Sequence, residues 1–283
     1  MRILLTGSKG FIGRATTAEL ERRGHEVVPF DLPRDVREPF HLWGLAKDCD
    51  GIINLAGKLG THELFGHEAE AASVNVIGAI NVYDAAARAG IPCVQVGTGH
   101  RGQPNPYAIT KACAEDLGLS RAQWQGEQIN VVRAYHAYGE WQLPGEPYGP
   151  APFQKFFPTF ACAALKGDKL DLCGGGQQLI DPVHVTDCAR VLVDALEPPY
   201  GEVREAGNGV PIQVSWVAKE VLRLAQDMLG TETLSLIETA DQRHGEPMNA
   251  IVVAQKPLCT NPWPYKVYET VEWYKQWLHS SQS

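Results

Sequence analysis

The sequence predicts an α/β protein with a doubly wound parallel sheet and a smaller C-terminal region. Short apolar runs alternate with helical patterns through the first half of the chain, and a Pro/Gly-rich stretch, "GEWQLPGEPYGPAP" (139–152), ends this alternation. Strands that alternate with helices form right-handed βαβ units, which place helices on both faces of a parallel sheet. We therefore expect one domain at 1–145 and a second region at 146–283, with 175–200 returning to the sheet.

The elements follow in order from their residues. A buried strand, "RILLTG", leads into a helix over 11–24 that ends at Gly24, because glycine is favoured just after the last helical turn. Further helical patterns cover 68–89 and 106–124. The other predicted strands are "HEVVPFD", "DGIINLAG", "IPCVQVGTG" and "INVVRAYHAYG".

Composition is that of a globular protein. The 283 residues are 44% hydrophobic and 20% charged, which is enough apolar material for a substantial core. The formal net charge of −8 argues against nucleic acid or an anionic membrane as partner, and no apolar run approaches the roughly 20 residues of a membrane helix. The seven scattered cysteines are typical of reduced thiols, so we expect a cytoplasmic protein.

Three glycines between the first strand and the first helix predict a dinucleotide site. Gly7 allows a tight turn, Gly10 lets the backbone approach a pyrophosphate, and Gly13 lets the helix pack closely. The start of the helix offers free N–H groups to phosphate. Asp31 ends the second strand, where its carboxylate can accept both ribose hydroxyls and would repel a 2′-phosphate. The pattern therefore favours NAD over NADP, although Arg34 lies nearby.

A second motif, "NPYAITKACAEDL", places Tyr107 and Lys111 four residues apart on one face of a predicted helix. A lysine beside a tyrosine and near a nicotinamide cation would lower the pKa of the phenol. Such a tyrosine can exchange a proton with an alcohol while a hydride moves to or from NAD. Alone, the spacing is common and usually means a packed ring and a solvated ammonium; beside the glycine loop, the catalytic interpretation is stronger.

Five motifs in order resemble the extended short-chain dehydrogenase/reductase family, and within it the NAD-dependent epimerase/dehydratase group that acts mostly on nucleotide sugars. They are "TGSKGFIG", "DGIINLAG", "VNVIGAINVYDAA", "PYAITK" and "IDPVHVTDCA". The resemblance implies an NAD-binding Rossmann domain at 1–145 and a mostly substrate-binding region at 146–283. It also implies a homodimer built on paired helices.

The resemblance assigns roles by position. It makes Tyr107 the proton carrier, Lys111 the group that positions the nicotinamide ribose, and Thr98 the partner of the reacting oxygen. It makes Asn75 a brace for the backbone. The cofactor positions that it implies are Gly7, Gly10, Phe11, Ile12, Gly13, Asp31, Asp35, Val36, Leu55, Ala56, Gly57 and Lys111.

Departures from the family pattern affect mainly the substrate side. Thr98 lies only about nine residues before Tyr107, where the family usually has a longer loop, so Gly99 or His100 is the alternative to Thr98 at the site. The strand end reads "VGTGHRG", without the carboxylate pair of the dehydratases, which argues against dehydration. His136 replaces an asparagine that often meets substrate phosphate. The stretch between strands after Asp31 is also short, as though one helix–strand unit were reduced to "LPRDVREPF".

The expected diphosphate contact also departs from the family pattern. Ile180 replaces an arginine that commonly pairs with the diphosphate, and loss of a bidentate arginine removes a strong contact. Arg243, in "DQRHGEPMNAI", is the candidate replacement, with a plain surface arginine as the alternative. Lys155 is a weaker second candidate.

Three functions compete. The first is an NAD-dependent epimerase of a nucleotide sugar, which oxidises a hydroxyl transiently and returns the hydride. The second is a reductase or dehydrogenase of a keto sugar or related alcohol, with the same residues but exchange of NAD(H) each turnover. The third is a non-catalytic dinucleotide sensor, which the presence of both Tyr107 and Lys111 disfavours. The histidines show no metal-ligand spacing, so no metal is expected.

Overall fold

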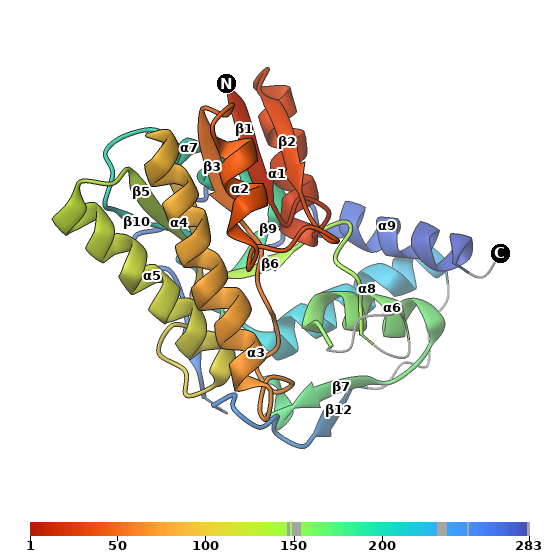
Figure 1. Cartoon of the computed structure of the whole chain (residues 1–283). Coiled ribbons are helices and arrows are strands. Elements are labelled where there is room, and N and C mark those ends of the chain that lie inside the picture. The colour runs from red at the N-terminus through yellow and green to blue at the C-terminus, as the bar shows by residue number, and fades with distance from the viewer. Residues whose placement is uncertain (146–147, 149–153, 231–236, 248, 282–283) are drawn as a thin grey trace.

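The computed structural model describes residues 1–145, 148, 154–230, 237–247 and 249–281 (Figure 1). Its largest sheet has six parallel strands in the order β10-β5-β4-β3-β1-β2. The strands are β1 (Arg2–Thr6), β2 (Glu26–Phe30), β3 (Gly51–Asn54), β4 (Cys93–Thr98), β5 (Ile129–Ala134) and β10 (Val203–Ala206). The predicted α/β class with a parallel Rossmann sheet is confirmed.

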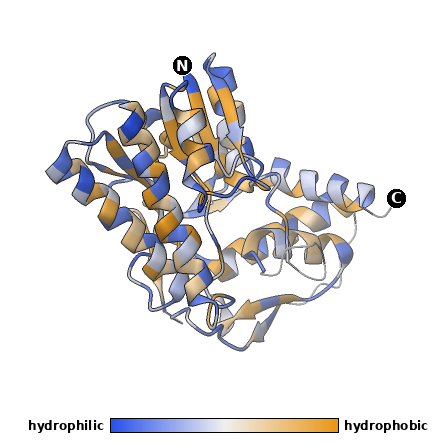
Figure 2. Cartoon of the chain, in the orientation of Figure 1, coloured by the Kyte–Doolittle hydropathy of each residue, from blue (hydrophilic) through white to orange (hydrophobic). Residues whose placement is uncertain are grey.

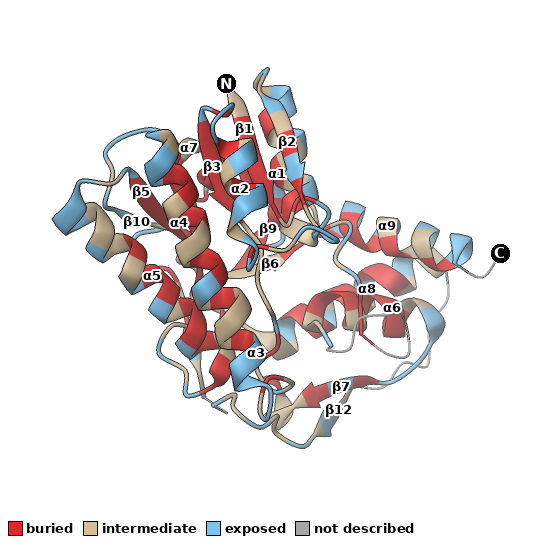
Figure 3. Ribbon diagram, in the orientation of Figure 1, coloured by how far each residue is buried: buried red, intermediate tan, exposed pale blue. Residues whose placement is uncertain are grey.

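Helices cover both faces of this sheet. Side chains of a strand alternate between faces, so β1 sends Ile3 and Leu5 to one hydrophobic cluster and Leu4 to another. The first cluster lies under α1 (Phe11–Arg22) and α7 (Val185–Asp194), which pack against each other. The second lies under α2 (Pro39–Ala46), α4 (Gly78–Ala89) and α5 (Pro106–Gln125). Figure 2 shows the hydrophobic strands between these helices, and Figure 3 shows that they are buried.

The chain between Asp31 and Asp50 does contain a short unit, as expected. The eight-residue helix α2 joins β2 to β3, and β2 forms the edge of the sheet. The helix predicted over 68–89 is seen as α3 (Glu68–Ala72), a π-helical turn at Ser73–Ile77, and α4. The helix predicted over 106–124 is α5, which is one residue longer at its C-terminus.

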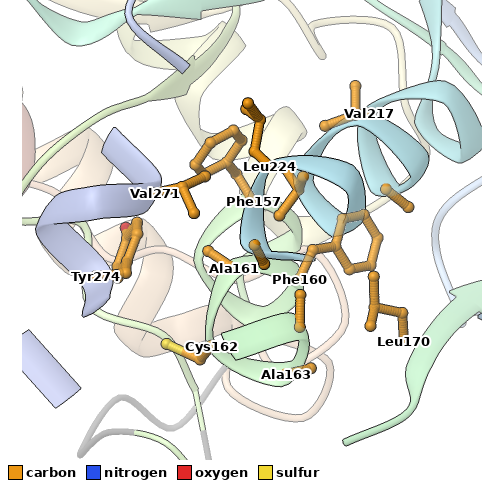
Figure 4. Packing of buried hydrophobic residues seen from close by; sticks show 14 of the residues in the cluster. Phe157, Phe160, Ala161, Cys162, Ala163, Leu170, Val217, Leu224, Val271 and Tyr274 are labelled. Atoms are coloured by element: carbon orange, nitrogen blue, oxygen red, sulfur yellow. The ribbon is translucent and has the colours of Figure 1, made fainter. Parts of the chain in front are cut away.

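The C-terminal region has a core of its own. Helices α6 (Phe156–Lys166), α8 (Val214–Leu229) and α9 (Val267–Ser280) pack together around buried aromatic and aliphatic side chains, including Phe157, Phe160 and Tyr274 (Figure 4). Small sheets border it. They pair β7 (Leu170–Cys173) with β12 (Ile237–Ala240), β8 (Leu179–Ile180) with β11 (Ile212–Gln213) and β13 (Ile251–Val252), and β6 (His136–Tyr138) with β9 (Pro182–His184). A 3-10 turn follows β7 at Gly174–Gly176.

Part of the C-terminal half of the chain returns to the large sheet. After β9, the chain crosses back and packs α7 against α1, and β10 then pairs with β5 at the edge of the large sheet. The segment 175–200 therefore includes α7, whereas the strand that joins the sheet lies just beyond it. Within the described part of the chain, no helix combines the length and apolar character that crossing a membrane requires.

Candidate active site

The glycine loop is built so that backbone meets backbone. Gly7 follows β1 with φ +66°, and a Cβ there would lie 3.0 Å from the backbone nitrogen of Ala56. A Cβ on Gly13 would collide with the Gly7 carbonyl oxygen and lie 2.8 Å from Cα of Ser8. Gly10 is the N-cap of α1, and its amide donates to the Gly7 carbonyl at 3.0 Å. The first turn of α1 can thus sit against the loop and direct its free N–H groups toward a phosphate.

Asp31 lies beside this loop. Its carboxylate accepts from the backbone amide of Lys9 at 2.7 Å and from that of Leu32 at 2.9 Å. These bonds fix the carboxylate at the carboxyl end of β2, next to the loop that the sequence assigns to the pyrophosphate. The geometry suits a ribose acceptor.

The remaining predicted cofactor positions lie in the segment after β2 and in the first turn of α1. Asp35 is held by Arg37, whose guanidinium donates to it at 2.5 Å and keeps the pKa of that carboxyl below its usual value. Val36 is buried against Gly78 at the start of α4. Phe11 and Ile12 are half-buried in the first turn of α1.

The end of β3 passes between the loop and α5. Backbone amides of Leu55 and Ala56 both donate to the Thr6 hydroxyl at 3.1 Å. A Cβ on Gly57 would lie 3.1 Å from the Asn75 Oδ1 and 3.8 Å from the Lys111 Nζ. The absence of a side chain at Gly57 therefore leaves room for the side chains of Asn75 and Lys111.

Asn75 braces this strand end. Its Oδ1 accepts from the Lys58 amide at 2.7 Å, and its Nδ2 donates to the Lys58 carbonyl at 3.1 Å and to the Thr110 hydroxyl at 2.9 Å. The residue lies in the π-helical turn before α4, a distortion frequent at functional sites. These bonds tie the segment after β3 to α5.

Tyr107 and Lys111 lie one turn apart on α5, as their spacing predicts. Lys111 is only 3% exposed, and burial lowers the pKa of its ammonium to about 8, with Glu115 opposing the change. Burial also raises the pKa of Tyr107, and a hydrogen bond with Thr98 opposes that rise. In the chain by itself, burial thus prevails over the lowering that the sequence analysis expected from Lys111, because desolvation penalises the phenolate.

Thr98 lies at the end of β4, beside the Tyr107 phenol, despite the short segment that separates them in sequence. Its hydroxyl also accepts from the His100 amide at 3.1 Å. Thr98 therefore meets Tyr107 at the carboxyl edge of the sheet, with Lys111 one turn further along α5. Thr98 and Lys111 are buried, and Tyr107 is half-buried. This edge is where open α/β sheets bind their ligands.

His100 and His136 meet close to Thr98. Their ring centroids lie 4.6 Å apart, with an interplanar angle of 67°. His136 begins β6, and its ring also faces Phe156, with centroids 6.1 Å apart. The two histidines predicted to line the substrate site thus come together from different segments.

Arg243 is not a bare surface cation. Its Nη2 pairs with Glu63 at 2.7 Å, and its Nη1 lies 3.6 Å from Glu246 and donates to the Gln154 carbonyl at 3.4 Å. Lys155 lies within electrostatic range of Glu63, Arg243 and Glu246, and burial lowers the pKa of its ammonium to about 8. A diphosphate that used Arg243 would compete with Glu63.

Sequence reasoning missed two residues of this region. Asn105 caps α5, because its Oδ1 accepts from the Ala108 amide at 2.9 Å, and its Nδ2 reaches the Gly245 carbonyl at 3.1 Å. The signal was present, since asparagine followed by proline is a typical start of a helix. No local sequence pattern singled out Glu63, because its partner, Arg243, lies far along the chain.

Comparison with known proteins adds the family. Residues 3–207, well over half the chain, match the family described as NAD dependent epimerase/dehydratase. A curated relative, UDP-N-acetyl-alpha-D-glucosaminuronate decarboxylase of Bacillus cytotoxicus, is 25% identical over 97% of this chain and 98% of its own. The dTDP-glucose 4,6-dehydratase of Streptomyces antibioticus is 24% identical over 97% of this chain and 92% of its own.

Solved structures share the fold. UDP-glucose 4-epimerase of Thermotoga maritima, with UDP-glucose, matches all of this chain and all of its own, with a TM-score of 0.81 and 20% identity. The UDP-glucose 4-epimerase of Thermus thermophilus, in complex with NAD, matches with a TM-score of 0.80 and 21% identity over 97% of this chain and 99% of its own. At such identities the likeness shows the fold. The family match confirms the predicted family and the predicted dependence on NAD.

Proposed function

This chain belongs to the NAD dependent epimerase/dehydratase family, and from that premise we propose that it is an epimerase of a nucleotide sugar. The observation that carries the proposal is the meeting of Thr98 with Tyr107, on the helix whose buried Lys111 lies next to Gly57. UDP-glucose and related sugars are named with its structural relatives, which supports this substrate class.

The residues present fit NAD. The close backbone contact at Gly7 and Gly13 leaves room for a pyrophosphate at the start of α1, and Asp31 is fixed where a ribose would lie. When bound, the nicotinamide would accept and return a hydride. Lys111 lies next to Gly57, on the path from the loop to Tyr107, and its ammonium would hold the nicotinamide ribose.

The chain's own groups handle the proton and the oxygen. Tyr107 takes the proton of the sugar hydroxyl as the carbonyl forms and returns it as the alcohol forms again. Thr98 hydrogen-bonds the reacting oxygen together with Tyr107. Rotation of the bound keto sugar, so that its opposite face receives the hydride, yields the epimer, while Arg243 and Lys155 would hold the diphosphate.

A turnover experiment distinguishes an epimerase from a net redox enzyme. The protein is incubated with UDP-glucose, UDP-N-acetylglucosamine and UDP-glucuronic acid, with and without stoichiometric NAD(H). We expect epimers to form with no net change in nicotinamide absorbance. Stoichiometric gain or loss of NADH matched to product would replace the proposal with the reductase or dehydrogenase.

Tyr107→Phe tests the proton carrier. The variant removes one oxygen and keeps the ring, so the fold and NAD affinity should remain, while turnover falls by roughly 10²–10⁴-fold. Tyr135→Phe is a matched control, because its phenol pairs with Glu205. Native activity of Tyr107→Phe on the true substrate would exclude Tyr107 as the proton carrier.

The homodimer is also a proposal. Helix α5 exposes 60% of Ile109, and an open depression of about 560 Å³ beside it is lined partly by Ala112, Cys113 and Leu117. An apolar face of this kind on a helix that also carries Tyr107 suits pairing with a second copy. Sedimentation velocity at several concentrations measures the oligomeric state. The cytoplasmic location stays a prediction.

A further inference from the structure

The His100–His136 pair has a feature that substrate binding alone does not explain. The Nδ1 atoms of both rings are buried, and neither has a hydrogen-bond partner among the described residues. Leaving a buried polar atom unpaired destabilises the folded chain, and native structures keep few such atoms. Two such atoms on neighbouring rings indicate that a ligand atom or a transferred proton supplies the missing hydrogen-bond partner.

The pair adjoins the reacting oxygen. The His100 amide donates to the Thr98 hydroxyl at 3.1 Å, and that hydroxyl bonds the Tyr107 phenol. His100 therefore lies two residues from the group assigned to the carbonyl oxygen, and His136 extends the pair by a ring contact of 4.6 Å. The pair therefore borders the position that Thr98 assigns to the reacting oxygen.

The surroundings keep both rings uncharged. Burial lowers the pKa of His100, against a side-chain hydrogen bond with Gln103 and the charge of Glu246, while Lys155 lowers it further. Burial lowers the pKa of His136 well below its ordinary value, and His100 adds to this effect. Phe156 closes one side. A neutral imidazole can accept a proton, so the pair is in the state that a base requires.

We propose that His100 and His136 form a second proton-transfer centre, which moves a proton to and from the sugar carbon beside the transient carbonyl. This rests on the proposed function, because only an oxidised neighbour makes that C–H bond acidic. The C–H bond breaks, its proton goes to an imidazole nitrogen, and its electron pair moves to form an enolate. Thr98 and Tyr107 hydrogen-bond the enolate oxygen. Return of the proton restores the ketone, and delivery to the opposite face inverts that carbon.

Turnover in D₂O tests the proposal. The holoenzyme is incubated with UDP-glucose, UDP-N-acetylglucosamine and UDP-glucuronic acid, and recovered sugars are analysed for deuterium by mass spectrometry and NMR. Hydride return alone places no solvent deuterium on carbon, whereas proton exchange labels the carbon next to the oxidised one. We expect that label in wild type and, in His100→Asn, a loss of about 10²-fold or more in the ratio of the labelling rate to the rate of nicotinamide reduction.

Controls separate the outcomes. His41→Asn, at an exposed site near Glu38, should label as wild type does. Nicotinamide reduction without label in wild type, or native labelling in both His100→Asn and His136→Gln, would overturn the proton-transfer centre and leave the epimerase intact. No nicotinamide reduction with any probe overturns the proposed function and this inference together. If a variant does not fold, ¹⁵N NMR of the wild-type imidazoles decides, because charged rings at neutral pH would contradict the proposal.

Discussion

The proposed cofactor side and the proposed substrate side of the site are built by different means. The cofactor side depends on backbone brought close by missing side chains, at Gly7, Gly13 and Gly57. The substrate side depends on side chains that meet from distant segments, such as His100 with His136 and Arg243 with Glu63. A backbone site tolerates no added atom, whereas a side-chain site can exchange one partner for another. Substitutions should therefore affect the two sides differently.

The largest effect is expected at Gly13. In Gly13→Ala the new Cβ collides with the Gly7 carbonyl, so α1 must move from the loop. Overpacking of this kind costs about 1–3 kcal/mol or more, and NAD binding should fall with it. Calorimetric titration with NAD and thermal unfolding measure both. Gly44→Ala, where an added Cβ meets nothing within 4 Å, is the matched control and should be neutral or stabilising. Equal NAD affinity and equal thermal stability of the two variants would contradict the role given to close backbone contact at Gly13.

Asp31→Ala should change cofactor choice. The carboxylate would accept ribose hydroxyls and repel a 2′-phosphate, so its removal should reduce the preference for NAD over NADP by roughly 1–3 kcal/mol. Affinities for both dinucleotides measure the change. Asp227→Asn, exposed on α8 beside Arg223, should leave the preference unaltered. Comparable affinity of the native protein for NAD and NADP would refute the role of Asp31.

The pH dependence of NAD binding tests Lys111. Its pKa is lowered to about 8, so the ammonium is charged below that pH and neutral above it. Affinity for NAD should therefore fall as pH rises through about 8. Lys111→Arg should remove this fall, since arginine stays charged. Lys155, which also titrates near pH 8, provides the control, and Lys155→Arg should leave the fall in place. Constant affinity between neutral and strongly alkaline pH would exclude a contact from the Lys111 ammonium.

The smallest effect is expected at Glu63. Glu63→Gln weakens the pair with Arg243 and frees the guanidinium for a diphosphate, so UDP should bind more tightly. A partly exposed pair is worth about 1 kcal/mol or less, which sets a gain of at most about fivefold. Arg243→Ala should weaken UDP binding and leave NAD binding unchanged. Arg223→Ala, in an exposed pair on α8, serves as control. Weaker UDP binding in Glu63→Gln would show that Glu63 supports the site and does not compete in it.

Sequence alone determined the parts that local physics controls. The alternation of strands and helices predicts the parallel sheet, because apolar residues repeat with a different period in a helix and in a strand and so identify each element. The spacing of Gly7, Gly10 and Gly13 and the one-turn spacing of Tyr107 and Lys111 predict a backbone loop and a shared helix face. These are properties of short segments, so no knowledge of distant contacts was needed.

Only the tertiary structure decided how distant segments meet. It brought Thr98 to Tyr107 across a short loop, placed the His100 and His136 rings edge to face, and paired Arg243 with Glu63. It also decided charge states, because burial raises the pKa of Tyr107 and lowers that of Lys111, and burial depends on what the rest of the chain packs over them. Short motifs carry no information about desolvation or about partners more than a hundred residues away, so these features required the folded chain.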